Sequence, residues 1–327
     1  MKAQARASAP AKVILLGEHF VVHGEPAIVL AIDKRATVTA KPRTDKKIWI
    51  KPEGMGVSGY FLNGRFHAEE GKAEKGKKLE PVYAVVRSLW DLSKKNVGID
   101  IHIDSSIPVA AGLGSSAAVA VASAAAISSL LNVELTKDEI FKLAFDAEKI
   151  VHGTTSGVDP AISTFGGVLL YRKGEKIKPL DIKVDLPLVI GDTRKEHSTG
   201  DMVARVSKMR ERYPLIMDKV IRAGGEVVTR SIEALKAGDL KTLGELMNID
   251  HALLYAVGVS NEYLEGLVCA ARKAGALGAK LTGAGGGGCV VALAVPERLK
   301  DIAEAIERAG GASFATRKTM EGVRIEE

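Results

Sequence analysis

Residues 108–131, PVAAGLGSSAAVAVASAAAISSLL, constrain the fold more than any other stretch of the chain. A turn rich in glycine and serine runs directly into a segment made mostly of Ala, Val and Ser, which we expect to be a slim helix. Such a helix either packs closely against its neighbours or carries a turn that binds an anion. The residues of this stretch alone leave both readings open.

The turn at residues 112–116 matches neither of two common nucleotide-binding patterns. It lacks the lysine of G-x-x-x-x-G-K-[ST], and its G-x-G is not followed by a third glycine at the dinucleotide-binding spacing. Its chemistry nevertheless suits a phosphate, because glycines let backbone N–H groups approach a ligand and a helix N-terminus attracts anions. The hydroxyls of Ser115 and Ser116 could bond phosphate or ligate Mg²⁺. The alternative is a plain Gly-Ser cap on a close-packed helix.

Composition narrows the class of protein. The 327 residues are 46% hydrophobic, which predicts a large core and two domains. The formal charge of +6 fits an acidic small molecule or a Lys-rich surface, and aromatic residues at 5% argue against a nucleic-acid partner. No segment is apolar enough for a signal peptide or a membrane span, so we expect no membrane partner. Cys269 and Cys289 lack metal-ligand spacing and favour a reducing cytoplasm.

The first half of the chain is predicted to form strands followed by helices. Short β-branched runs bounded by Gly, Pro or Asp predict strands at residues 12–16, 27–32, 35–40, 47–51 and 98–104. The polar, Lys-rich residues 66–80 predict a solvated loop. Helices are expected from Pro81, which suits a first helical position, and from Thr136, which forms a capping-box pattern with Glu139.

The second half has a different character, and a domain boundary is expected near residue 178. Residues 199–275 predict several successive helices. Further elements are expected as strands at 279–283 and 288–295, a helix from Pro296 to about Arg308, and a last strand near 312–318. This mixed order favours α+β layers over strict βαβ alternation.

A second glycine-rich stretch, KLTGAGGGGCVVAL, follows the predicted helices. Its five glycines between residues 283 and 288 disfavour any regular element, because each costs roughly 0.5–1 kcal/mol in a helix or strand. A loop that must approach a ligand or another loop closely would tolerate that cost. A mobile hairpin turn is the alternative.

Charged side chains gather around the first predicted strand. Lys12 lies at its start, and Glu18 and His19 follow the glycine that ends it, where side chains can face a cleft. The alternatives are that Lys12 is a strand-end lysine with a solvated ammonium group and that Glu18 and His19 lie in a solvated turn.

Two further carboxylates lie near the middle of the chain. Glu148 falls late in an amphipathic helix, and Asp159 follows an irregular Gly/Thr/Ser segment just before Pro160. One carboxylate could hold a metal while the other receives a proton. Asp159 could also be only part of an Asp-Pro turn.

Three motifs carry a resemblance over nearly the whole chain. APAKVILLGEHFVVHG, PVAAGLGSSAA and KLTGAGGGGCV occur in that order, and together they resemble the galactokinase–homoserine kinase–mevalonate kinase–phosphomevalonate kinase (GHMP) family. Galactokinases have R-x-N-L-x-G-E-H-T-D-Y where this chain has Lys12 and GEHFVVHG. GEHFVVHG and IVHGTTSGVDPAISTFGG are most similar to the mevalonate kinase branch, with a compact archaeal-type length.

The resemblance implies a two-domain α+β kinase with ATP in a cleft between the domains. Residues 1–178 would form an N-terminal α/β domain that binds ATP, and residues 179–327 a C-terminal ferredoxin-like α+β domain. The implied reaction is ATP- and Mg²⁺-dependent phosphorylation of the primary alcohol of (R)-mevalonate in the cytoplasm, and a homodimer is a further expectation. Alternatives are another kinase of the family, acting on phosphomevalonate or a sugar, and a catalytically inactive ligand-sensing member.

The resemblance also assigns roles to residues. The catalytic base would be Asp159, with Lys12 beside it. The ATP phosphates would lie on Pro108, Val109, Ala110, Ala111, Gly112, Leu113, Gly114, Ser115 and Ser116. Mg²⁺ would be held by Ser116 and Glu148. Substrate would meet Glu18, His19, Thr199 and Gly285, together with one of Arg194, Lys195 or His197.

Overall fold

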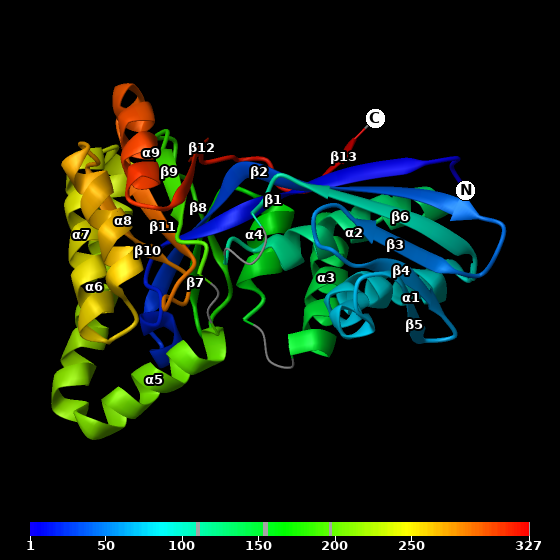
Figure 1. Ribbon diagram of the computed structural model, residues 1–327, viewed down its shortest axis with the longest axis horizontal. Helices are drawn as coiled ribbons and strands as arrows, with labels where there is room; N and C mark the ends of the chain where they lie inside the picture. The colour runs from blue at the N-terminus through cyan, green and yellow to red at the C-terminus, as the bar shows by residue number, and fades with distance from the viewer. Residues whose placement is uncertain (109–111, 153–155, 196–197, 327) are drawn as a thin grey trace.

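The computed structural model describes residues 1–108, 112–152, 156–195 and 198–326, and their strands form two sheets. Figure 1 shows an elongated molecule in which the long strands β1 and β2 of the first sheet run from one end toward the second sheet. The mixed α+β layers predicted from the order of elements are therefore present. Among the described residues, every helix is too short or too polar to cross a bilayer.

The first sheet is built on β1 (Ala5–Leu16) and β2 (Pro26–Arg43), which pair antiparallel over most of their length. Its main path runs β13-β1-β2-β6-β3-β4-β5, and β7 and β8 extend from β2. The remaining bounds are β3 (Ile48–Pro52), β4 (Ser58–Leu62), β5 (Arg65–Glu70), β6 (Gly98–Ser105), β7 (Val168–Arg172), β8 (Lys178–Leu180) and β13 (Arg324–Glu326).

The predicted strands of this sheet are present, with two differences. The runs at 27–32 and 35–40 form one continuous strand, β2, and the ladder shifts register opposite Pro10 and Ala11. The prediction of a loop at 66–80 is wrong, because that segment holds most of β5 and the 3₁₀ helix η2 (Ala73–Leu79). Five of the six residues of β5 are exposed, so no apolar alternation marks this edge strand in the sequence.

Helices α1 (Glu80–Ser93), α2 (Ser115–Leu131), α3 (Lys137–His152) and α4 (Val158–Phe165) pack around the first sheet. The Ala/Ser helix α2 contacts β1, β2 and the other three helices, and 13 of its 17 residues are buried. Small side chains allow this close approach from several sides. The capping box of α3 is confirmed: the Thr136 N–H donates to Glu139 Oε2 (2.8 Å), and the Glu139 N–H donates to Thr136 Oγ1 (3.3 Å).

The second sheet contains β9 (Pro187–Asp192), β10 (Gly278–Thr282), β11 (Cys289–Leu293) and β12 (Ala312–Arg317). Its spatial order β10-β11-β9-β12, with every pairing antiparallel, is the ferredoxin-like arrangement that the resemblance implies. The helices of this half are α5 (Thr199–Arg212), α6 (Pro214–Ala237), α7 (Leu240–Ala256), α8 (Glu262–Lys273), the 3₁₀ turn η3 (Pro296–Arg298) and α9 (Leu299–Arg308). Figure 1 places α6 to α9 together at the end of the molecule away from α1 and α3.

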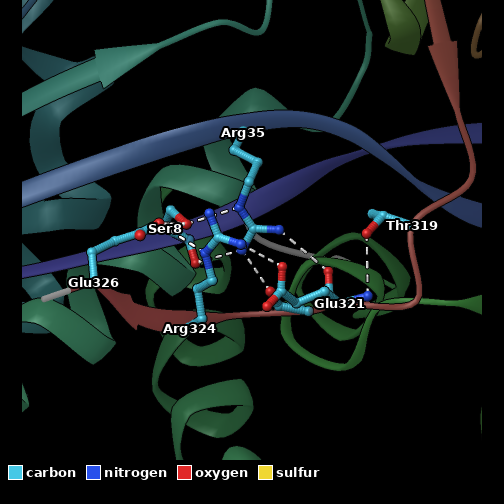
Figure 2. A network of polar contacts seen from close by, with 7 residues as sticks. Ser8, Arg35, Thr319, Glu321, Arg324 and Glu326 are labelled. Carbon is cyan, nitrogen blue, oxygen red and sulfur yellow. Dashed lines mark hydrogen bonds and ion pairs between the residues drawn. The ribbon is translucent and has the colours of Figure 1, made fainter.

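The C-terminal segment returns to the first sheet, where β13 pairs with β1. Figure 2 shows Arg35 at the centre of the contacts that hold it there. The Arg35 guanidinium donates to Ser8 Oγ (2.8 Å) and to the carbonyl oxygen of Gly322 (2.6 Å). Ser8 Oγ in turn donates to Glu326 Oε1 (2.5 Å). The chain therefore changes sheet between β8 and β9 and changes back after β12.

Candidate active site

A lysine and an aspartate from distant parts of the chain form an ion pair below the start of α2. Lys12 lies on β1, and its backbone N–H donates to the carbonyl oxygen of Leu113 (3.0 Å). Its Nζ lies 3.3 Å from Asp159 Oδ1, with exposed side-chain fractions of 7% for the lysine and 33% for the aspartate. Asp159 therefore stays accessible to a ligand while a buried cation balances its charge.

Asp159 is in the first turn of a helix and not in a simple Asp-Pro turn. Helix α4 begins at Val158, after Gly157 in the left-handed conformation. Pro160 fits there because the first N–H groups of a helix need no intrahelical acceptor. The helix start directs the carboxylate back toward β1, where Lys12 lies.

Gly114 joins Lys12 to the glycine-rich turn. It is the N-cap of α2 with φ 73°, and a Cβ placed on it would lie 2.7 Å from Lys12 Cγ. A side chain at this position would therefore displace the lysine. A Cβ on Gly112, by contrast, would meet no described heavy atom within 4 Å, so Gly112 borders open space.

The rest of the predicted phosphate loop is described in part. Pro108 and Ser115 are half-buried, Leu113 is buried and Ser116 is exposed at the start of α2. Val109, Ala110 and Ala111 lie outside the described residues. The orphan N–H groups in the first turn of α2 and the two serine hydroxyls give this end of the helix several hydrogen-bond donors.

The residues predicted for Mg²⁺ are Ser116, in the first turn of α2, and Glu148 on α3, which is 5% exposed. The described residues contain no group of three His, Cys, Asp or Glu side chains arranged for a metal. Mg²⁺ does not need one, because it is usually held by one or two carboxylates together with substrate phosphates and water. A carboxylate and a hydroxyl are oxygen ligands of this kind, so Ser116 and Glu148 fit that donor set and stay a prediction.

The segment after β1 forms a strained turn at His19, whose backbone angles are φ 62° and ψ −44°. The Phe20 N–H donates to the carbonyl oxygen of Glu18 (2.7 Å), which makes a γ-turn centred on His19. His19 Nε2 lies 2.7 Å from the carbonyl oxygen of Ala284 in the third motif. Burial lowers the pKa of His19, so the imidazole is neutral, donates from Nε2 and keeps Nδ1 as an acceptor.

Glu18 belongs to a buried cluster whose other members the sequence did not reveal. Its carboxyl group contacts Lys280 Nζ on β10, and the same ammonium lies 3.3 Å from Asp250 Oδ2 on α7. All three side chains are at most 1% exposed. Burial, with the nearby Asp250 adding to it, raises the pKa of Glu18 to about 8, and burial also raises the pKa of Asp250. Glu18 as a direct substrate contact stays a prediction, because its carboxylate is directed at Lys280.

The second glycine-rich stretch, which is the third motif, lies beside the predicted phosphate loop. A Cβ on Gly283 would lie 4.0 Å from the carbonyl oxygen of Gly112. Gly285 is packed against the backbone of Val259, where a Cβ would come within 2.2 Å of the carbonyl oxygen. Close packing therefore explains the glycine at 285, and its contact with substrate stays a prediction.

The predicted basic residues before α5 take different positions. The Lys195 carbonyl accepts from the Gly288 N–H (3.1 Å), and the Lys195 ammonium lies over the ring of Tyr263. Arg194 lines a separate hollow of about 520 Å³ beside residues 310–313. Thr199 is exposed at the first position of α5. His197 lies outside the described residues. Of the two that are described, Lys195 contacts the third motif, through its backbone carbonyl, and which basic side chain faces the substrate stays a prediction.

Comparisons with known proteins show which proteins this chain is similar to. The family descriptions "GHMP kinases N terminal domain" and "GHMP kinases C terminal" match residues 80–167 and 231–313. The chain is 46% identical to a mevalonate kinase of Pyrococcus horikoshii, covering 98% of this chain and 97% of that protein. The solved structure of the L. major mevalonate kinase in complex with R-mevalonate has a TM-score of 0.86 at 30% identity, covering 98% of both chains. The Methanococcus jannaschii mevalonate kinase has a TM-score of 0.81 at 28% identity, covering 96% of this chain and 98% of that one. The chain belongs to the GHMP kinase family.

Proposed function

We propose that this protein is an ATP-dependent mevalonate kinase, which transfers the γ-phosphoryl group of ATP to the primary alcohol of (R)-mevalonate. The products are 5-phosphomevalonate and ADP. The observation that carries the proposal is the Lys12–Asp159 ion pair at the start of α2, which brings an accessible carboxylate, a buried cation and a helix N-terminus together. Similarity to mevalonate kinases over nearly the whole chain supports the choice of acceptor.

The proposed roles follow from what phosphoryl transfer requires. The reaction needs aligned reactants and neutralised charge more than covalent help from the protein. Asp159 accepts the proton of the attacking hydroxyl, and Lys12 stabilises negative charge that develops on the acceptor oxygen. The amides of the 112–116 turn and the hydroxyl of Ser115 bind the phosphates.

The cation that accompanies ATP is Mg²⁺ in this proposal. Ser116 and Glu148 would hold it, and it would supply positive charge that offsets part of the charge on the ATP phosphates. On the acceptor side, neutral His19 offers Nδ1 as a hydrogen-bond acceptor to a substrate hydroxyl. Thr199 and Gly285 are assigned to the same pocket, with Lys195 as the cation facing the mevalonate carboxylate.

We also propose a division of labour between the two halves of the chain. Residues 1–178 bind the nucleotide and residues 179–327 complete the acceptor side. The chain changes sheet shortly after this boundary, between β8 and β9, and of the described strands from there on only β13 returns to the first sheet. The two free thiols, Cys269 and Cys289, fit a cytoplasmic enzyme. A homodimer remains a prediction that light scattering would test.

A substrate panel tests the function directly. ADP release is measured with (R)-mevalonate, phosphomevalonate, galactose and homoserine at equal concentrations, with Mg·ATP in excess. We expect mevalonate to give a kcat/KM at least 100-fold above each of the others. A higher value for phosphomevalonate or galactose would assign a different acceptor, and no ADP release with any of them would favour an inactive, ligand-sensing member of the family.

A further inference from the structure

The turn at His19 is held in an unfavourable backbone conformation, so something around it must fix it there. Positive φ with negative ψ is rare for a residue that has a Cβ, and strain of this kind persists where the surroundings determine it. On its C-terminal side, Phe20 is fully buried with its ring against Gly224 of α6. On its N-terminal side, Glu18 is fixed by the buried cluster with Lys280 and Asp250.

The cluster connects elements from both halves of the chain. Glu18 follows β1 of the first sheet, Lys280 lies in β10 of the second sheet, and Asp250 lies on α7, which packs against β10. Lys280 Nζ also donates to the carbonyl oxygen of Leu281 (2.7 Å). The ammonium is therefore held by β10 and α7 while it contacts the residue next to His19.

Stability alone gives little reason for such a cluster. Replacing a buried ion pair by apolar side chains of similar volume is often neutral or stabilising, because charges lose their hydration on burial. Charged hydrogen bonds do have strict geometry, and they fix the backbone that carries them. The strained turn that the cluster fixes also carries the imidazole bonded to Ala284.

We infer that Lys280, oriented by Asp250, is a positioning residue for the acceptor substrate, acting through the Glu18–His19 turn. The inference rests on the proposed function for the identity of the acceptor. Lys280 itself does not touch substrate. It keeps the turn in its strained form, and thereby keeps His19 Nδ1 directed at the acceptor pocket.

The test compares Lys280→Met with Lys318→Met. Lys318 is a suitable control because its Nζ also donates to backbone carbonyl oxygens, those of Ile182 (2.5 Å) and Val184 (2.8 Å), away from the His19 turn. We expect Lys280→Met to raise the KM for mevalonate at least 10-fold and to change the KM for ATP less than twofold. Lys318→Met lowers the melting temperature but leaves both KM values within twofold.

A double-mutant cycle with His19→Ala separates positioning from general destabilisation. In the His19→Ala background, Lys280→Met should raise the mevalonate KM less than threefold further, because the residue through which it acts is gone. Equal effects in both backgrounds, or equal effects on ATP and mevalonate, would overturn the inference.

Two further measurements cover the cases in which Lys280→Met does not fold or the acceptor is not mevalonate. If Lys280→Met does not fold, Lys280→Met with Asp250→Asn leaves a single carboxyl that can stay protonated, and the same 10-fold rise is expected. An unchanged mevalonate KM in that double variant contradicts the inference. If wild-type protein phosphorylates another member of the substrate panel, the proposed function fails and the same measurement is made with that acceptor.

Discussion

Two lysine–carboxylate contacts flank the end of β1, and they differ in their access to water. In the first, buried Lys12 meets Asp159, whose side chain is one third exposed. In the second, Lys280 and two carboxyl groups are all closed off from solvent. A carboxylate that water and substrate can reach is suited to accept a proton, whereas a closed cluster is suited to fix a backbone. We therefore propose that similar residue types serve proton transfer in one place and backbone positioning in the other.

The largest expected effect comes from the open pair, which is formed by Lys12 and Asp159. Asp159→Asn keeps the size of the side chain but removes the base, so kcat should fall by about 10²–10⁴-fold. The KM values should change less than threefold, because the interaction acts in the transition state. Asp218→Asn is the matched control, since Asp218 is also ion-paired, to Arg210 at 2.7 Å, on the surface. Near-normal turnover of Asp159→Asn would falsify the assignment of the base.

A smaller loss is expected when the open pair is displaced rather than removed. Gly114→Ala should lower kcat by roughly 10–100-fold, because the new Cβ meets the stem of Lys12 and misplaces its ammonium. Gly54→Ala is the control: Gly54 has the same φ of 73°, and a Cβ there meets nothing within 4 Å. Steady-state kinetics and thermal melts of both variants separate the contact from backbone strain. Equal kcat values in the two variants would show that the contact with Lys12 is unimportant.

The smallest effect is on stability and concerns the closed cluster, which is formed by Glu18, Lys280 and Asp250. The pKa of Glu18 is about 8 in the folded protein and 4.5 as its ordinary value, so the folded state keeps a proton that the unfolded chain releases. This contribution to stability is complete below about pH 4.5 and is lost as pH rises through about 8. Asp250→Asn removes the carboxyl that repels Glu18, so the fall in unfolding free energy between pH 6 and pH 9 should shrink by about 1–3 kcal/mol.

Urea titrations across that pH range measure this change in unfolding free energy for wild type and Asp250→Asn. An equal pH dependence in the two proteins would contradict the proposed coupling between Glu18 and Asp250.

The open pair could be predicted from sequence and the closed cluster could not. Lys12 and Asp159 lie in recognisable motifs. The order of these motifs also predicted the fold, including its ferredoxin-like second half. Glu18 was also predicted as a site residue because it lies in the first motif. Lys280 and Asp250 were missed as its partners because 262 residues separate Lys280 from Glu18, and only the packing of β10 and α7 against the end of β1 joins them. A lysine inside an apolar strand was the available signal, since a fully buried lysine needs a partner.

The prediction of local structure failed where burial leaves no apolar pattern in the sequence. The exposed edge strand β5 has no apolar alternation, and an Asp-Pro pair hid the start of α4 because it suits a turn as well as a first helical turn. His19 shows a further limit. Its strained conformation depends on Phe20, Glu18 and Ala284, and no local propensity predicts a positive φ for a histidine flanked by such residues.

The most direct test of the central claim is a crystal structure with (R)-mevalonate and a non-hydrolysable Mg·ATP analogue. We expect the terminal phosphates on the amides of residues 112–116 and the primary hydroxyl of mevalonate within hydrogen-bonding distance of Asp159, with Lys12 beside both. A nucleotide bound elsewhere, or a mevalonate hydroxyl that points away from Asp159, would contradict that claim.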